Sequence, residues 1–397
     1  MELGDVQATA LTDGTHTWPV QRTGTGAIAW VENLPAKGWA CFRPVEAPAE
    51  SPFRRSDDFH LETPFYSVVL DRAGRFLSLF DKTEQRELCR KGRALNSLRL
   101  YEDKPIYYDN WDIDMYYTEK SWPVEEVLSF EWIEDGPVRT TLAVSLRCCS
   151  SVICQKIHFY AQQRRIDFVT TADWKEHQHL LKAEFPVDIH SDEATFEIQF
   201  GAVTRKVHTN TSWEQARFES CGHRWMDFSE AKYGVSLMND CKYGHSVRDG
   251  VLGLTLIKCG IEPNPNTDCE MHRFTYSLYP HSGTWREANT VLEAAKLNQP
   301  GYFHPGGCDG ERFSYVSLDQ DNVILETVKQ AESGDGVILR LYESQNARTR
   351  TTVTLPAGTK QVFVTNLLEE PEIQLPVVNG TVSLVVKPYE IVTLLAK

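Results

Sequence analysis

The chain has 397 residues, 41% of them hydrophobic, 11% aromatic and 24% charged, and its formal net charge is −14 at pH 7. This length allows two or three domains with a large core. The negative charge argues against a nucleic-acid partner, because binding to phosphates needs a basic surface. No apolar run is long enough to span a bilayer and the first residues lack an apolar signal-peptide core, so we expect a cytoplasmic protein with no membrane partner.

Residues 1–50 predict short strands followed by a connection. The run AIAWVENLPAKGWACFRPV alternates apolar and polar residues and turns at Pro35–Gly38, which is typical of a hairpin. Because the chain is strand-like from its first residues, we expect Met1 to mark a truncation rather than a natural domain start. Residues 47–58 are rich in Pro, Ser and charged residues and predict a linker or a long surface loop.

Residues 51–320 carry many short apolar runs with period two, and β-branched residues are enriched in them. Only Glu287–Leu297 has the composition and spacing of a helix. Residues 321–397 show six more strand signals, separated by turn residues such as Asn379-Gly380, and predict a small closing β-sandwich. The predicted fold class is therefore all-β, with a large antiparallel super-sandwich flanked by smaller β-sandwich elements.

The stretch Leu95–Trp122, LNSLRLYEDKPIYYDNWDIDMYYTEKSW, interleaves aromatic rings with carboxylates. This composition suits a sugar, because rings stack on its C–H patches and carboxylates accept hydrogen bonds from its hydroxyls. The alternative is a strand and a long loop whose aromatic residues are core and whose acids are solvated. The rings are Tyr101, Tyr107, Tyr108, Trp111, Tyr116, Tyr117 and Trp122, and the acids are Glu102, Asp103, Asp109, Asp112 and Asp114.

A second stretch, Gly222–Ser246, reads GHRWMDFSEAKYGVSLMNDCKYGHS. Together, EDKPIYYDNWDID and HRWMDFSEAKYGVSLMNDCKYG resemble the C-terminal region of family 38 glycoside hydrolases, the retaining α-mannosidases, and most closely their cytosolic and bacterial branch. With NLPAKG near the start and VTNLLEEP near the end, the resemblance covers nearly the whole chain. It implies that residues 1–50 are strands of a small β-sandwich and that residues 51–320 form a super-sandwich of the galactose-mutarotase type.

The resemblance also implies where the chemistry of the whole enzyme lies. Retaining glycosidases normally use two carboxyl groups about 5 Å apart. Family 38 enzymes add a zinc ion, held by a His-x-Asp pair, the nucleophilic Asp and a further His, all in an N-terminal catalytic domain that precedes this region. We therefore expect zinc as the cofactor of the full-length enzyme, no metal ligand or catalytic residue in this chain, and the missing catalytic domain as its partner.

The resemblance further implies that the two stretches contribute side chains to the sugar cleft beside the zinc. A cation among carboxylates could orient hydroxyls and balance the charge of the transition state. The alternative is that Lys242 and Asp240 pair with each other at a surface turn, where such a pair contributes little. The predicted substrate-binding residues are Asp109, Trp111, Asp112, Asp114, His223, Arg224, Asp227, Glu230, Asn239, Asp240, Lys242 and Tyr243.

Two short histidine strings could bind a metal on spacing alone. His190-Ser191-Asp192 has His-x-Asp spacing, but it lies between two predicted strands without a nucleophile segment, and a polar turn is favoured. His177 and His179 alternate along a strand and so share a face, but no third ligand is evident. Trp174 and His177 could instead line a sugar cleft, although a paired strand end is the favoured interpretation.

The ten cysteines are scattered without CxxC spacing, and the tightest cluster is Cys148, Cys149 and Cys154. This cluster has no histidine at zinc-finger spacing, so reduced thiols are expected there rather than a structural zinc. The sequence contains no GxSxG nucleophile setting and no GxxxxGK[ST] phosphate loop, so serine hydrolase and P-loop chemistry are not indicated.

Three functions remain in competition. The first is the C-terminal β region of a zinc-dependent retaining α-mannosidase that acts on a mannoside or oligosaccharide and is inactive alone. The second is a stand-alone, non-catalytic β-sandwich that binds carbohydrate or another subunit. The third is an aldose epimerase with His223 and Glu230 as acid and base. If the catalytic domain is missing, an exposed apolar patch should cause self-association as a homo-oligomer, or leave a shallow groove beside the DNWDID loop.

Overall fold

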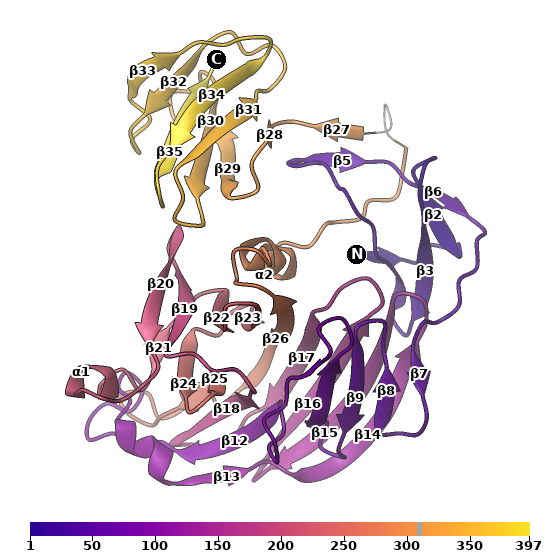
Figure 1. Cartoon of the computed structure of the whole chain (residues 1–397), viewed down its shortest axis with the longest axis vertical. Coiled ribbons are helices and arrows are strands. Elements are labelled where there is room, and N and C mark those ends of the chain that lie inside the picture. The colour runs from indigo at the N-terminus through magenta and orange to yellow at the C-terminus, as the bar shows by residue number, and fades with distance from the viewer. Residues whose placement is uncertain (308–311) are drawn as a thin grey trace.

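The computed structural model describes residues 1–307 and 312–397, and its strands pair antiparallel throughout (Figure 1). This arrangement confirms the predicted all-β fold class. A central sandwich lies at the bottom of Figure 1, an N-terminal sheet lies at the right and a C-terminal sandwich lies at the upper left. Within the described ranges, no helix has the length and apolar character needed to cross a membrane.

The central sandwich packs one large sheet against two smaller ones. The nine-stranded sheet runs in spatial order β14 (Glu126–Asp135), β15 (Arg139–Cys148), β16 (Ser151–Tyr160), β17 (Ile166–Asp173), β26 (Met271–Ser282), β23 (Tyr233–Asn239), β22 (Trp225–Ser229), β19 (Glu193–Ile198) and β20 (Gly201–Lys206). The six-stranded sheet runs β13 (Ser121–Pro123), β12 (Ser97–Glu102), β18 (His179–Pro186), β25 (Val251–Cys259), β24 (Gly244–Arg248) and β21 (Ser220–Cys221). The five-stranded sheet runs β11 (Arg86–Glu87), β10 (Phe76–Asp81), β9 (Tyr66–Leu70), β8 (His60–Glu62) and β7 (Arg54–Arg55).

The inner faces of these sheets share one hydrophobic core. The Phe168 ring of β17 stacks on the Tyr276 ring of β26 with a centroid separation of 4.9 Å, and the Phe185 ring of β18 in the facing sheet lies 5.7 Å from Phe168. Phe76 of β10 lies 5.7 Å from Phe168 as well. The period-two pattern causes this packing, because alternate residues of a strand point to one face.

Smaller sheets flank the sandwich at both ends of the chain. The N-terminal sheet runs β1 (Glu2–Gly4), β4 (Gly26–Ala29), β3 (Thr17–Thr23), β2 (Ala10–Thr12) and β6 (Arg43–Val45), while β5 (Gly38–Ala40) pairs with β27 (Arg312–Ser314). The C-terminal sandwich has a three-stranded sheet, β28 (Ser317–Leu318), β31 (Thr349–Thr354) and β34 (Thr381–Val386). Its five-stranded sheet runs β29 (Val323–Gln330), β30 (Val337–Glu343), β35 (Ile391–Ala396), β32 (Val362–Thr365) and β33 (Pro371–Leu375).

The helices are short: α1 (Ser212–Gln215), the 3₁₀ helix η1 (Met115–Glu119) and α2 (Thr290–Asn298). The helix predicted at Glu287–Leu297 is confirmed by α2, whose Val291 and Ala294 pack on Trp225 of β22. The predicted linker at 47–58 contains the two-residue edge strand β7. The Asn379-Gly380 turn is confirmed, since both residues have positive φ angles as a two-residue hairpin turn requires.

Four connections leave the central sandwich at the same edge, and we call residues 103–120, 174–178, 240–243 and 260–270 the rim. Three of them cross from one sheet to the other: 174–178 joins β17 to β18, 240–243 joins β23 to β24, and 260–270 joins β25 to β26. The fourth, residues 103–120, follows β12, whose last residue Glu102 pairs with His179, which in turn pairs with Cys259. The topology therefore brings both motif stretches to one edge of the sandwich.

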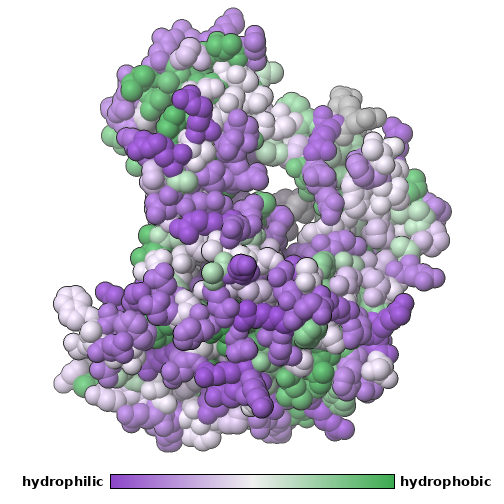
Figure 2. Space-filling model, in the orientation of Figure 1, coloured by the Kyte–Doolittle hydropathy of each residue, from purple (hydrophilic) through white to green (hydrophobic). Residues whose placement is uncertain are grey.

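Figure 2 shows a mainly hydrophilic face, hollowed between the C-terminal sandwich and the N-terminal sheet. The exposed apolar side chains of the rim gather instead on residues 103–120. Ile106, Tyr107 and Trp111 are each more than 70% exposed, and Tyr116 is 64% exposed. This loop therefore carries an apolar patch of the kind that soluble proteins normally cover.

Candidate functional site

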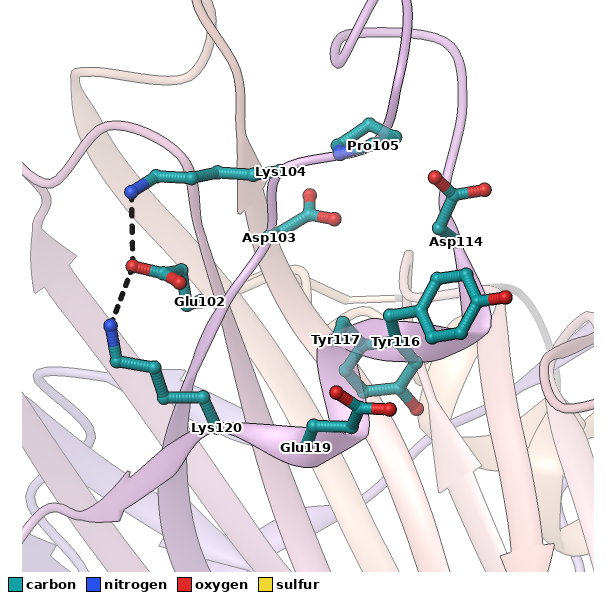
Figure 3. Close-up of a pocket in the computed structure, with 9 residues that line it drawn as sticks. All are labelled: Glu102, Asp103, Lys104, Pro105, Asp114, Tyr116, Tyr117, Glu119 and Lys120. Carbon is teal, nitrogen blue, oxygen red and sulfur yellow. Dashed lines mark hydrogen bonds and ion pairs between the residues drawn. The ribbon is translucent and has the colours of Figure 1, made fainter.

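A pocket of about 260 Å³ opens where residues 103–120 turn back over the end of β12 (Figure 3). Its lining combines four carboxylates, two lysines and two tyrosine rings: Glu102, Asp103, Lys104, Pro105, Asp114, Tyr116, Tyr117, Glu119 and Lys120. In Figure 3, Asp103 and Asp114 lie on either side of the opening, and Tyr116 and Tyr117 lie below it. Carboxylates beside aromatic faces are the groups with which a protein holds a sugar.

The charges around this pocket are partly paired. Glu102 accepts hydrogen bonds from Lys104 at 2.9 Å and from Lys120 at 3.0 Å, which ties the two ends of the loop together. Asp103 is 1% exposed, and the Lys258 ammonium lies 2.8 Å from its carboxylate. Burial raises the pKa of Asp103 and Lys258 offsets this only in part. A buried carboxyl with a raised pKa beside a cavity is typical of functional sites.

Asp109 anchors the loop from inside rather than facing the pocket. Its carboxylate accepts hydrogen bonds from the backbone N–H groups of Ile261 and Glu262, both at 2.8 Å, and from the Gln178 side chain at 3.2 Å. Burial alone would raise the pKa of Asp109, but these hydrogen bonds to the charged form outweigh it and lower the pKa. Asp109 therefore fastens residues 103–120 to two other connections of the rim.

The other predicted residues of this loop are accessible. Trp111 is 75% exposed, and its ring lies 5.4 Å from that of Tyr108. Asp112 is exposed and accepts a hydrogen bond from the next backbone N–H, that of Ile113. Asp114 accepts a hydrogen bond from the Ile106 backbone N–H at 3.1 Å and lines the pocket. Of the four predicted residues in this loop, Asp114 is the one placed for contact with a molecule in the pocket.

A buried charge pair lies beneath the pocket. Lys182 of β18 is 2% exposed and pairs with Glu219, while its ammonium also donates to Ser246 Oγ at 2.8 Å. The Tyr117 hydroxyl donates to Glu219 at 2.6 Å, and burial raises the pKa of Tyr117. The η1 helix thus folds over the outer face of the six-stranded sheet and fixes one tyrosine of the pocket from below.

Arg224, directly before β22, and Asp227, within it, make contacts inside the protein. Arg224 donates to Glu197, which is 4% exposed, with Nη2–Oε1 at 2.6 Å. Asp227 is 2% exposed and accepts hydrogen bonds from Ser236 at 2.9 Å and bonds the His281 ring at 2.8 Å. These two predicted substrate-binding residues therefore support the sheet in this structure.

Glu230 and His223 lie at opposite ends of β22. Glu230 forms a bidentate ion pair with Arg86, and these hydrogen bonds lower the pKa of the Glu230 carboxyl. The two residues are seven steps apart along a chain that is mostly the strand β22, which corresponds to about 23 Å at about 3.3 Å per residue. The epimerase hypothesis requires His223 and Glu230 to converge in one cleft, so the structure contradicts it.

The turn after β23 is held by its own polar groups. Asn239 Oδ1 accepts a hydrogen bond from the Lys242 backbone N–H at 2.7 Å, and Asp240 accepts one from the Thr275 backbone N–H at 2.9 Å. The Lys242 ammonium lies over the Phe274 ring at 4.6 Å, so the structure does not support the alternative in which Lys242 pairs with Asp240. Tyr243 is 50% exposed, and its ring lies 5.3 Å from that of His223.

The structure thus brings the first stretch and the turn of the second stretch to the same rim, but only Asp114 of the twelve predicted residues lines the pocket. The remaining lining residues all come from the Leu95–Trp122 stretch. Glu102, Asp103, Tyr116 and Tyr117 were named there because of its composition, whereas Lys104, Pro105, Glu119 and Lys120 were not named. They come from the end of β12, the loop after it and η1, and a sequence pattern cannot separate such carboxylates and tyrosines from those of a solvated loop. The substrate-binding role of each predicted residue stays a prediction.

The predicted metal candidates also have definite places. Asp192 pairs with Lys206 at 2.9 Å on an exposed turn, so His190-Ser191-Asp192 is a polar turn without a metal set. Cys148, Cys149 and Cys154 are free thiols, as predicted. The zinc site that the resemblance implies needs two histidines and two aspartates, and no group of described residues has this composition. His177 does have further donors nearby, Cys259 and Cys269, which the sequence reading missed.

Comparisons with known proteins match the central part of the chain and its C-terminal sandwich. The model of the glycosyl hydrolases family 38 C-terminal domain matches residues 61–266, and that of the family 38 C-terminal beta sandwich domain matches residues 322–394. "Alpha-mannosidase 2C1" of Homo sapiens is 35% identical over 344 residues, which are 84% of this chain and 33% of that protein. "Alpha-mannosidase G" of Dictyostelium discoideum is 34% identical over 329 residues, 79% of this chain and 30% of that protein.

The fold has close solved counterparts. The crystal structure of an alpha-mannosidase from Enterococcus faecalis V583 superposes with a TM-score of 0.74 at 17% identity, covering 94% of this chain and 46% of that one. At this identity the likeness shows the fold alone. The chain spans about a third of the length of the curated relatives that it matches.

Proposed function

Because the chain belongs to glycoside hydrolase family 38 through its C-terminal domains, we propose that it works as the C-terminal β region of an α-mannosidase. In this role it supports the fold of the whole enzyme and supplies one wall of the cleft that holds an α-mannoside or oligosaccharide. The observation that carries the proposal is the acidic and aromatic pocket at the rim, where both motif stretches leave the sandwich.

The residues of this chain would bind and orient the sugar. Asp114 and Glu119 offer carboxylate oxygens to hydroxyl groups, and the exposed Tyr116 ring offers a face for the C–H side of a sugar. Asp103 would support the pocket from behind, because both of its carboxylate oxygens are buried and the Lys258 ammonium lies 2.8 Å from one of them. These contacts would position the substrate without themselves breaking the bond.

The bond cleavage itself is proposed to come from an N-terminal catalytic region, with zinc and a nucleophilic carboxylate, and to proceed with retention. This part of the proposal rests on the resemblance of the motifs. Zinc bound there would grip vicinal sugar hydroxyls. Since the described residues of this chain do not form that zinc site, no step of the cleavage is assigned to them. A cytoplasmic location belongs to the same proposal.

The apolar patch of residues 103–120 is the proposed contact surface for that catalytic region. Its members are Ile106, Tyr107, Tyr108, Trp111 and Tyr116, and Tyr116 also lines the pocket. A partner that covers this patch would bury it and would cover Tyr116 at the pocket. Self-association of this chain through the patch is the competing use of the same surface.

Hydrolysis of 4-nitrophenyl α-mannoside tests the proposal. The 397-residue chain should show no turnover with added zinc or with a chelator, whereas a chain extended upstream to the length of the relatives should show chelator-sensitive turnover. In the extended chain, Glu119→Gln and Asp114→Asn should each raise KM by about 10-fold, because a hydrogen bond to a charged group contributes about 1.5–3 kcal/mol. Asp192→Asn, on a turn away from the pocket, is the matched control.

Two outcomes would contradict this function. Chelator-sensitive turnover by the 397-residue chain would mean that it holds a complete active site of its own. An inactive extended chain, together with mannoside binding by the shorter chain, would favour the stand-alone carbohydrate-binding module.

A further inference from the structure

We propose that His177, Cys259 and Cys269 form a binding site for one Zn²⁺ ion at the rim. The three residues come from three different places: the connection before β18, the last residue of β25 and the connection between β25 and β26. One ligand atom from each lies within 4.8 Å of the other two. Folding therefore assembles a His-Cys-Cys set from residues that are 10 to 92 positions apart in the sequence.

The distances between the donor atoms match the edges of a tetrahedron around zinc. The two sulfur atoms are 3.4 Å apart, and His177 Nδ1 lies 4.0 Å from Cys259 Sγ and 3.7 Å from Cys269 Sγ. With Zn–S bonds of about 2.3 Å and a Zn–N bond of about 2.0–2.1 Å, tetrahedral edges are about 3.8 Å between sulfurs and about 3.6 Å between nitrogen and sulfur. Shifts of a few tenths of an ångström would seat the ion.

The chemistry of the donors selects the metal class. Two thiolates and one imidazole favour Zn²⁺ over Mg²⁺ or Ca²⁺, which prefer oxygen ligands. Cys259 is fully buried, Cys269 is half-buried and His177 is exposed. The group is therefore shielded from solvent on the Cys259 side, and an ion can enter from the His177 side. Three protein donors leave the fourth position to a water molecule.

Zinc here would hold the 260–270 connection to the start of β18. The segment directly after Cys259 provides the two backbone N–H groups that bind Asp109. In the same segment, the Glu262 carbonyl accepts a hydrogen bond from the Asn110 backbone N–H at 3.1 Å. Fixing Cys259 and Cys269 therefore fixes the surface against which residues 108–112 are packed. The site rests on this geometry and stands whether or not the proposed function is right.

The competing use of the two cysteines is a disulfide. Their sulfur atoms are 3.4 Å apart, well beyond the S–S bond length of about 2.05 Å, and both are free thiols. Oxidation would join the two sulfurs with loss of two protons and two electrons to an added oxidant, and it would leave His177 without a role. A metal uses all three side chains, which favours the zinc site over the disulfide.

Zinc titration of the reduced, metal-free 397-residue chain against a chromophoric chelator tests the proposal. We expect one equivalent of Zn²⁺ per chain, and Co²⁺ in the same site should show the intense absorption of thiolate-bound tetrahedral cobalt. His177→Gln and Cys269→Ser should each weaken binding by about 100-fold or more, because even the loss of a supporting residue around a metal typically costs about 10- to 100-fold. Both residues lie at the accessible side of the group, so these variants should still fold.

Cys221→Ser is the matched control, since Cys221 is an exposed free thiol on β21. It should bind zinc like the unaltered chain. Hydrogen exchange gives a second readout, in which zinc should slow the exchange of backbone amides in residues 260–270. Three results would overturn the proposal: absence of a stoichiometric zinc equivalent, binding that persists in both variants, or a Cys259–Cys269 disulfide in freshly isolated protein that contains no zinc.

Discussion

Replacing Lys182 by methionine would leave a carboxylate without its cation beneath the pocket. Lys182 is 2% exposed, and its ammonium contacts Glu219, the Tyr117 hydroxyl at 3.2 Å and Ser246 Oγ at 2.8 Å. The Glu219 side chain is only 12% exposed, so water cannot easily replace the lost partner. Methionine fills most of the same space, which limits the change to the charge and its hydrogen bonds.

We expect Lys182→Met to lower the free energy of unfolding by about 3–5 kcal/mol, the usual cost of breaking a buried ion pair by removing one partner. The double variant Lys182→Met with Glu219→Gln should recover much of that loss, because replacing both members of a buried pair is often nearly neutral. The matched control is Lys206→Met, whose partners are exposed carboxylates, and its effect should stay below about 1 kcal/mol.

Urea unfolding followed by tryptophan fluorescence measures these differences, provided that the slope of the transition is unchanged among the variants. The coupling energy from the double-mutant cycle isolates the pair from other effects of each substitution. If Lys182→Met destabilised the protein no more than Lys206→Met does, or if Glu219→Gln failed to rescue it, the buried pair would not support the pocket as argued.

Three further outcomes are expected. Burial lowers the pKa of His158 to about 4 and that of His245 to about 3, whereas the pKa of an unfolded histidine is about 6.5. The free energy of unfolding should therefore be at its maximum above pH 6.5. Towards pH 4 it should fall by up to about 1.4 kcal/mol per pH unit for each of the two histidines. Urea unfolding at pH 7 and pH 5 should show this fall, and His158→Gln should reduce it; equal stability at both pH values would contradict it. Asp109→Ala should speed hydrogen exchange in residues 103–120, since it removes the acceptor of two backbone N–H groups; unchanged exchange would mean that other contacts hold the loop. Gly38→Ala should disrupt the pairing of β5 with β27, because a Cβ there would lie 1.9 Å from the Phe313 carbonyl oxygen, and an unchanged melting temperature would refute this.

The fold class could be predicted because it depends on local periodicity. In β15, for example, Leu142, Val144 and Leu146 are buried while the residues between them are less so, and the sequence shows the same alternation. The Asn379-Gly380 turn depends on two residues that tolerate positive φ. Such signals are contained in a few neighbouring residues, and tertiary packing strengthens them rather than reversing them.

The site could be predicted only to the level of the loop. Asp109 and Asp114 lie five residues apart in the same aromatic and acidic stretch, yet one carboxylate is buried against two backbone N–H groups and the other lines the pocket. Which of them turns inward depends on the 260–270 connection, some 150 residues later in the chain. The same holds for Asp227, whose partners Ser236 and His281 come from two other strands.

The His-Cys-Cys group could not be predicted from the sequence either. The sequence places His179 at strand spacing from His177, which suggests that the two could share a metal. In the structure the His179 ring instead contacts the backbone carbonyl of His177 at 2.6 Å. Cys259 reaches His177 because its strand pairs with β18, and Cys269 reaches both because the connection after β25 turns back. Spacing along the chain carries no information about such a meeting, whereas the register of β18 with β25 determines it.

The rim links the two proposals and also allows them to fail separately. Cys269 belongs to the connection that holds Asp109, and Asp109 holds the loop that carries Asp114. If both proposals are right, Cys269→Ser should reduce zinc binding and also raise the KM of the extended enzyme, whereas Glu119→Gln should raise KM and leave zinc affinity unchanged. If Cys269→Ser abolished zinc binding without changing KM, the zinc site would not be needed to position the residues of the pocket. A change in KM without a zinc equivalent would show that the packing of residues 260–270, and not a metal, positions the sugar-binding loop.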